Sequence, residues 1–221
     1  SKFLRAYLYK KVIINRLNIK KRLSTYDIQK KLIDYNQKEV ENLILTNTSY
    51  SSIVDFPENS TFFHYKHKLF SELLVWDYDK VKELIYFIAS KRKNLIFSSE
   101  INNYKSDQFF CKNFNTIDFK NNKFNKVNDK NILFLKNING ASLFDAIYHS
   151  NDIIAPEGTI THMGHYLKKD IIALLHFKLR NRQDFINQII SCKEWFPPNN
   201  FKYTVLKKDF THSLRKLEKR I

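Results

Sequence analysis

From residue 61 onward, short apolar runs alternate with stretches in which apolar residues recur at helical spacing. The short runs predict strands at residues 61–65, 94–98, 131–135, 152–155 and 171–177, and a further extended segment at 201–206. The stretches between them predict helices at 77–91, 107–113, 142–150, 159–167, 183–192 and 209–220, whereas the polar segment 115–130 indicates a loop or a weak strand. Because buried strands that alternate with helices form βαβ units, we expect an α/β, Rossmann-like fold with a parallel sheet covered by helices on both faces.

A different pattern precedes this region. Apolar residues at helical spacing, with Lys and Arg between them, predict a first helix within residues 1–22 and a second from Ser24 or Thr25 to about Leu45. Residues 47–60 are rich in Ser, Thr and Asn and contain Pro57, which indicates a linker. We therefore expect a basic α-helical segment with a linker at 1–60, followed by the Rossmann-like domain at 61–221.

The net charge of +16 first suggests a polyanionic partner, either nucleic acid or a membrane surface, although a biased composition would produce the same figure. The position of the charged residues along the chain helps to decide whether the charge indicates such a partner. Residues 1–22 carry +8 and residues 202–221 carry +5, which leaves +3 for all the residues between them. The body of the chain is therefore nearly neutral, which weakens the case for a nucleic-acid-binding protein.

The segment around residues 152–167 is the most informative for chemistry. A predicted strand ends at Ala155, a turn contains Glu157 and Gly158, and a helix starts at Thr159. Backbone N–H groups at a helix start can hold a phosphate, Gly158 lets the backbone approach it, and the hydroxyl groups of Thr159 and Thr161 add donors. Glu157 can accept hydrogen bonds from sugar hydroxyls, and His162 can donate to a phosphate oxygen. The alternative is structural: Gly158 makes the turn, Thr159 caps the helix and His162 packs against the sheet.

This segment resembles the nucleotide-sugar site of the heptosyltransferase-type glycosyltransferases of lipopolysaccharide biosynthesis, which have the GT-B fold. The resemblance rests on Glu157-Gly158-Thr159-Ile160-Thr161-His162, with Glu where the family usually has Asp, and on the helix and strand that follow. It implies that residues 157–162 hold the donor diphosphate and sugar, that Lys66 and Lys68 lie after the first strand of the domain near the donor, and that Glu100 lies near the nucleoside. It also implies a nucleotide-sugar as substrate, no metal and no other cofactor.

The resemblance covers residues 62–220, which correspond to the C-terminal half of a GT-B enzyme. We expect transfer of a sugar to a cell-surface glycan or a lipid-linked acceptor. The acceptor domain and the catalytic base of this fold come from the other half, so we assign no catalytic residue. The chain is then a fragment, an enzyme with a much reduced N-terminal half, or a non-catalytic Rossmann-like binding module.

Other patterns point to weaker alternatives. His64, Lys66 and His67 follow a predicted strand and favour a basic site facing a phosphate over a metal site, with a plain surface turn as the alternative. Lysines interleaved with Phe in 115–130 could stack on single-stranded nucleic acid, although a loop is the simpler interpretation. Cys111 and Cys192 are too few for a disulfide framework, fit a reducing compartment and are expected to be inert.

We expect a cytoplasmic location. No apolar run reaches the roughly 18–20 residues that span a bilayer, and the basic start lacks the apolar region of a signal peptide. The absence of Met at position 1 indicates a processed or truncated chain. Two interpretations of residues 1–22 stay open: a helix lying on the inner face of an anionic membrane, or a helix packed on the domain.

Overall fold

The structure, a computed structural model, describes residues 56–100, 104–127, 131–176 and 201–221. They all belong to one compact unit that comprises residues 50–176 and 200–221. The helices predicted within residues 1–45, the helix predicted at 183–192 and most of the predicted linker lie outside the described residues.

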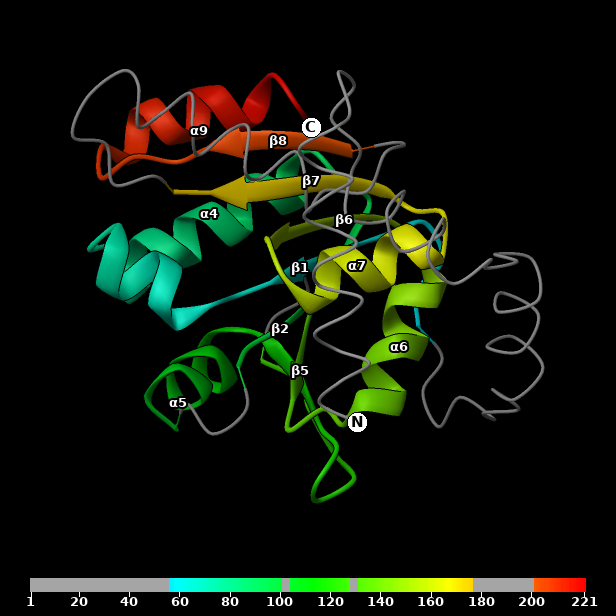
Figure 1. Cartoon of the computed structure of the whole chain (residues 1–221). Coiled ribbons are helices and arrows are strands. Elements are labelled where there is room, and N and C mark those ends of the chain that lie inside the picture. The colour runs from blue at the N-terminus through cyan, green and yellow to red at the C-terminus, as the bar shows by residue number, and fades with distance from the viewer. Residues whose placement is uncertain (1–55, 101–103, 128–130, 177–200) are drawn as a thin grey trace, which may run out of the picture. The chain divides into compact units, whose positions relative to one another are not determined.

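One sheet of eight strands forms the centre of this unit (Figure 1). The strands are β1 (Ser60–His64), β2 (Asn94–Ser98), β3 (Asn115–Asp118), β4 (Lys123–Asn125), β5 (Ile132–Lys136), β6 (Ser150–Pro156), β7 (Asp170–Leu175) and β8 (Phe201–Val205). Their order is β4-β3-β5-β2-β1-β6-β7-β8, and every neighbouring pair is parallel except β3 and β4. Apart from the β3–β4 hairpin, this is the doubly wound order in which the chain builds outward on both sides of its first strand, so the α/β, Rossmann-like prediction is confirmed.

Helices cover both faces of the sheet (Figure 1). They are η1 (Lys68–Leu73), α4 (Tyr78–Ser90), α5 (Tyr104–Asn113), α6 (Gly140–His149), α7 (Thr159–Tyr166) and α9 (Phe210–Glu218). Buried residues of η1, α4, α5 and α9 pack in one core with Phe63 and Phe97, whereas those of α6 and α7 pack in a second core with Phe62 and Ile96. Neighbouring residues of one strand therefore face different cores, which explains why the strands are continuous apolar runs.

Side-chain caps fix several helix starts close to the predicted positions. The carboxylate of Asp77 accepts a hydrogen bond from the Lys80 backbone N–H at 2.9 Å, and Asp209 accepts one from the His212 N–H at 2.9 Å. The side chain of Asn139 does the same at the start of α6. Each cap satisfies a backbone donor that has no partner within its helix.

The structure adds one element to the sequence prediction and sharpens two others. The segment after β1, expected to be a loop, contains the π-helix η1, in which the Leu74 N–H donates to the Leu69 carbonyl. The aromatic core stabilises this short element, because Phe70 is fully buried and stacks on Tyr65. The polar segment 115–130 contributes the hairpin β3–β4, and β1 begins at Ser60, inside the predicted linker.

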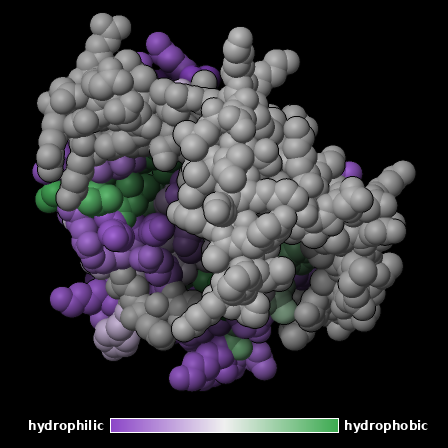
Figure 2. Space-filling view, viewed as in Figure 1, coloured by the Kyte–Doolittle hydropathy of each residue, from purple (hydrophilic) through white to green (hydrophobic). Residues whose placement is uncertain are grey.

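The surface is mainly hydrophilic where Figure 2 shows described residues, with small hydrophobic areas between them. Val75, Tyr104 and Phe124 are the most exposed of the large hydrophobic side chains in the described part of the chain. In that part, no helix combines the length and the apolar composition that a bilayer span requires.

Candidate functional site

The strand order marks one position at the carboxyl edge of the sheet where a ligand is expected. β1 and β6 are paired, with Phe63 opposite Ile154. After β1 the chain leaves through η1 and α4 on one face, and after β6 it leaves through α7 on the other. The two connections diverge, and doubly wound sheets bind ligands at such a switch point in strand order.

His64 ends β1 and is held by the neighbouring strand. Its Nδ1 lies 2.9 Å from the Ser98 hydroxyl at the end of β2. Burial, together with the positive charge of Lys66, lowers the pKa of His64 to about 4. The imidazole is therefore neutral at pH 7, so it contributes hydrogen bonds to this edge rather than charge.

The loop after β1 is tied to the end of β2. One carboxylate oxygen of Glu100 accepts a hydrogen bond of 2.8 Å from the His67 backbone N–H. Tyr65 is fully buried, and its hydroxyl lies 2.9 Å from the Ser71 hydroxyl and 3.2 Å from Nδ1 of His67. Burial raises the pKa of Tyr65 to about 12, so the phenol stays protonated. These bonds fix the loop that carries Lys66, and the start of η1 with Lys68, at the carboxyl edge.

The turn from β6 into α7 has a conformation that favours glycine. Gly158 has φ 149° and ψ −155°, a backbone region that L side chains rarely adopt. The Thr161 hydroxyl donates to the Gly158 carbonyl at 2.8 Å and accepts from the Gly158 N–H at 3.2 Å. Thr161 is buried, and its hydroxyl holds the turn.

The other residues of this turn lie nearer the surface. Thr159 is exposed, and Glu157, Gly158 and His162 are half-buried. The first hydrogen bond along α7 joins the His162 N–H to the Gly158 carbonyl at 3.2 Å, and the amides of the first helical turn have no acceptor within the helix. Burial lowers the pKa of His162, which favours the neutral imidazole at pH 7.

The structure therefore brings all eight predicted site residues to one edge of three neighbouring strands. Lys66 and Lys68 follow β1, Glu100 follows β2, and residues 157–162 follow β6. Sequence reasoning missed the bond between His64 and Ser98, because the two residues belong to different strands. Their shared position at strand ends was the signal that could have suggested it.

The described part of the chain offers no cluster of side chains for a metal ion. Within those residues, no group of three or more His, Cys, Asp or Glu side chains could hold an ion. Nδ1 of His64 and Nδ1 of His67 instead face the hydroxyls of Ser98 and Tyr65. Cys111 is half-buried, and burial raises the pKa of its thiol, which disfavours the reactive thiolate.

No protein-family model and no curated protein matches the chain. Among solved structures, it is similar to ADP-heptose lipopolysaccharide heptosyltransferase II of E. coli, with 8% identity and a TM-score of 0.45 over 83% of this chain and 50% of that chain. The UDP-GlcNAc 2-epimerase of Methanocaldococcus jannaschii shares 14% identity, with a TM-score of 0.45 over 82% of this chain and 44% of that chain. A glycosyl transferase family 9 protein of Veillonella parvula shares 11% identity, with a TM-score of 0.41 over 84% and 44% of the respective chains. The chain thus spans about half the length of these proteins.

Proposed function

We propose that this domain binds the nucleotide-activated sugar of a glycosyltransferase at the carboxyl edge of its sheet. The observation that carries the proposal is the β6–α7 turn: a Gly158 in a glycine-only conformation opens a helix at the switch point of a doubly wound sheet. The resemblance of residues 157–162 to the donor site of heptosyltransferase-type enzymes supports the same assignment.

Each residue of the edge has a distinct task in this proposal. The first-turn amides of α7 and the exposed Thr159 hydroxyl donate to the diphosphate, and the neutral imidazole of His162 donates one N–H. Glu157 accepts from sugar hydroxyls. Lys66 and Lys68, on either side of the His67 amide that Glu100 holds, supply positive charge from the β1 side of the site.

The chemistry would be sugar transfer from the donor to an acceptor hydroxyl. The acceptor oxygen bonds to the anomeric carbon, the bond from that carbon to the diphosphate oxygen breaks, and the hydroxyl proton passes to a base. Negative charge grows on the leaving diphosphate, so donors aimed at it stabilise the transition state more than the ground state. We propose a cell-surface glycan or a lipid-linked molecule as acceptor and no metal, and we assign no base.

A thermal-shift screen of the full chain against nucleotide diphosphate sugars tests the binding site. A donor at about 100 times its Kd stabilises the fold by about 2.7 kcal/mol, which raises Tm by roughly 5–10 °C for a chain of this size. We expect Glu157→Ala and His162→Ala to remove the shift. Glu83→Ala, which removes an exposed carboxylate from α4, is the matched control and should keep it. No shift with any donor, or equal shifts in all variants, would contradict the proposal.

Sugar release and transfer distinguish an enzyme from a binding module. Incubation of the full chain with the donor that gives the largest shift, with and without glycan or lipid-linked acceptors, should yield free nucleotide diphosphate in an enzyme. Binding without turnover would identify a non-catalytic Rossmann-like module. Binding of single-stranded nucleic acid that vanishes in modest salt, without any donor binding, would favour a nucleic-acid-binding protein instead.

We also propose a cytoplasmic location, where nucleotide-sugars are made, with peripheral contact to the anionic inner membrane face through residues 1–22. The +8 charge of that segment supports this contact. Co-sedimentation of the chain with anionic vesicles, and its loss when residues 1–22 are removed, tests it. Equal sedimentation of the shortened chain would contradict it.

A further inference from the structure

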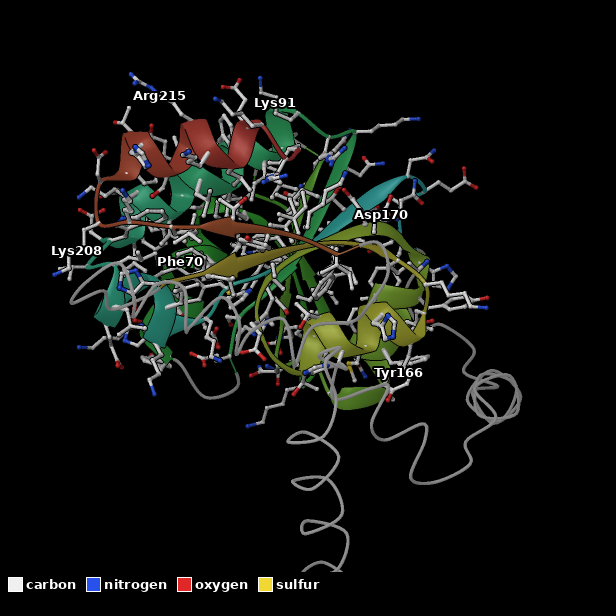
Figure 3. The ribbon with its side chains drawn as sticks, turned by 45° about the horizontal axis from the view of Figure 1, so that its top comes forward. Phe70, Lys91, Tyr166, Asp170, Lys208 and Arg215 are labelled. Carbon is white, nitrogen blue, oxygen red and sulfur yellow. The ribbon has the colours of Figure 1, made fainter. Side chains whose placement is uncertain are left out.

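A hollow lies at the amino edge of the sheet, at the opposite end from the proposed donor site. It has a volume of about 440 Å³ and is lined by the starts of β6, β7 and β8, the residue before β1, and the ends of α4 and α9. Figure 3 shows Asp170, at the start of β7, at the opposite end of the sheet from Phe70 and Lys208, which lie at the carboxyl edge. Cavities of this size hold small molecules.

The lining of this hollow is strongly basic. It contains five cationic side chains and only two side-chain carboxylates (Lys91, Arg92, Lys93, Lys202, Arg220, Asp152, Asp170). Apart from the consecutive Lys91, Arg92 and Lys93, these residues are far apart in the sequence, so the fold brings their charges together.

Some of these charges are already compensated. Arg92 forms an ion pair with Asp152 at 2.8 Å, and the Thr61 hydroxyl donates to the same carboxylate at 2.5 Å. Lys91 pairs with Glu218 at 2.8 Å. These contacts give the hollow a fixed wall, because Arg92 and Asp152 are both more than two-thirds buried.

The remaining cations have no such compensation. Lys93, Lys202 and Arg220 are exposed, and in the described part of the chain none of them has a side-chain hydrogen bond or an ion pair. Nε of Arg92 is buried and has no acceptor among the described residues, so one donor of the wall is also unsatisfied there.

Stabilisation of helix ends explains only part of this cluster. Cations after the last turn of a helix interact favourably with its dipole, which accounts for Lys91 after α4 and Arg220 after α9. It does not account for Lys202, which lies within β8 opposite Ile172 of β7. A Lys on the edge strand β8 also discourages pairing with other chains, so the argument for a ligand rests on the gathering of Lys202 with the other cations in one hollow.

We infer that this amino-edge hollow binds a small phosphorylated sugar or polyol. The three uncompensated cations would hold the phosphate groups, as expected for a concave site with an excess of one charge sign. Asn59, Asn151 and Asp170, which share the lining, offer amide and carboxylate oxygens to hydroxyl groups. The inference does not rest on the proposed donor site, because it uses none of the same residues.

Calorimetric titration of the full chain with fructose 1,6-bisphosphate tests the inference, with fructose as the uncharged comparison. The variant carrying Lys93→Ala, Lys202→Ala and Arg220→Ala should bind about tenfold more weakly, since each partly exposed charge contributes a few tenths to about one kcal/mol. The matched control carries Lys105→Ala, Lys112→Ala and Lys123→Ala, which remove three exposed lysines away from the hollow. Its affinity should stay within about twofold of the original chain.

A third variant separates the two edges of the sheet. Lys66→Ala with Lys68→Ala should leave the affinity for the bisphosphate unchanged while weakening donor binding. The inference is overturned if the bisphosphate does not bind at about 1 mM, if fructose binds equally well, if both triple variants lose the same affinity, or if only the Lys66 and Lys68 variant loses it. Failure of donor binding alone would contradict the proposed function and leave the amino-edge hollow unaffected.

Discussion

Replacing Gly158 with Ala tests the central feature of the candidate site without altering any packing. A Cβ at this position would meet no atom within 4 Å, so the substitution creates no clash. Its effect comes from the backbone, because φ 149° and ψ −155° form a region that is essentially restricted to glycine.

The size of the effect follows from two opposing contributions. Holding an L-residue in such a conformation costs about 1–3 kcal/mol, whereas the lower conformational entropy of Ala in the unfolded chain returns about 0.4–1 kcal/mol. Gly158→Ala should therefore lower the free energy of unfolding by roughly 1–2 kcal/mol. For a chain of this length, Tm should fall by about 2–8 °C.

Gly140→Ala is the matched control. Gly140 opens α6, has an ordinary backbone conformation and also leaves open space around an added Cβ. Urea unfolding of both variants should show Gly140→Ala unchanged or more stable by up to about 1 kcal/mol. Equal stability of the two variants would refute the assignment of strain to Gly158. If the turn in Gly158→Ala relaxed to a backbone conformation that Ala readily adopts, donor binding would also weaken, and the thermal-shift screen measures that effect separately.

Three further substitutions probe the core and the charged groups. Gly164→Ala would bring a Cβ to 2.2 Å from Cδ1 of Ile153, so urea unfolding should show a free energy of unfolding that is lower by about 1–3 kcal/mol. An unchanged unfolding midpoint would mean that α7 and β6 are not so closely packed. The pKa of His64 is about 4 in the folded protein against 6.5 for an ordinary His, so the unfolded chain binds the proton at higher pH than the folded chain does. The free energy of unfolding should therefore fall by roughly 3 kcal/mol as the pH drops from 6.5 to 4, and His64→Gln should remove this pH dependence. Burial alone would raise the pKa of Asp118, but hydrogen bonds from Asn137, Asn121 and Lys136 lower it to about 2. These bonds should add roughly 2 kcal/mol to the free energy of unfolding above pH 4, and this gain should be lost as the pH falls through 2. If Asp118→Asn lost as much stability in acid as the original chain, this explanation would be contradicted.

Much of the fold could be predicted from the sequence because the strands are buried on both faces. A run such as residues 94–98 is apolar without alternation, and the structure places β2 at those same residues. Helix starts were also predictable where a short polar side chain precedes the apolar pattern, as at Asp77. Local rules suffice in these cases because the element and its stabilising contacts are close in sequence.

Tertiary contacts decide the features that were not predicted. η1 exists because Phe70 and Leu69 fit an aromatic core, and no local signal marks a π-helix. The eight predicted site residues did meet at one edge, yet the task of Thr161 could not be foreseen, since its hydroxyl turns back to Gly158. The amino-edge hollow could not be predicted either, because Arg92, Asp152 and Lys202 meet only after the strands have been ordered.

The central position of β1 also has a consequence for synthesis on the ribosome. Both neighbours of β1 follow it in the chain, and β6 emerges roughly 90 residues after β1, as the bond between Thr61 and Asp152 illustrates. During that interval β2 can already pair with one edge of β1, while the other edge stays open beside the apolar side chains of residues 62 and 63. An unpaired, apolar strand edge can pair with other nascent chains. A chaperone would therefore protect the open edge of β1 until β6 has emerged from the ribosome.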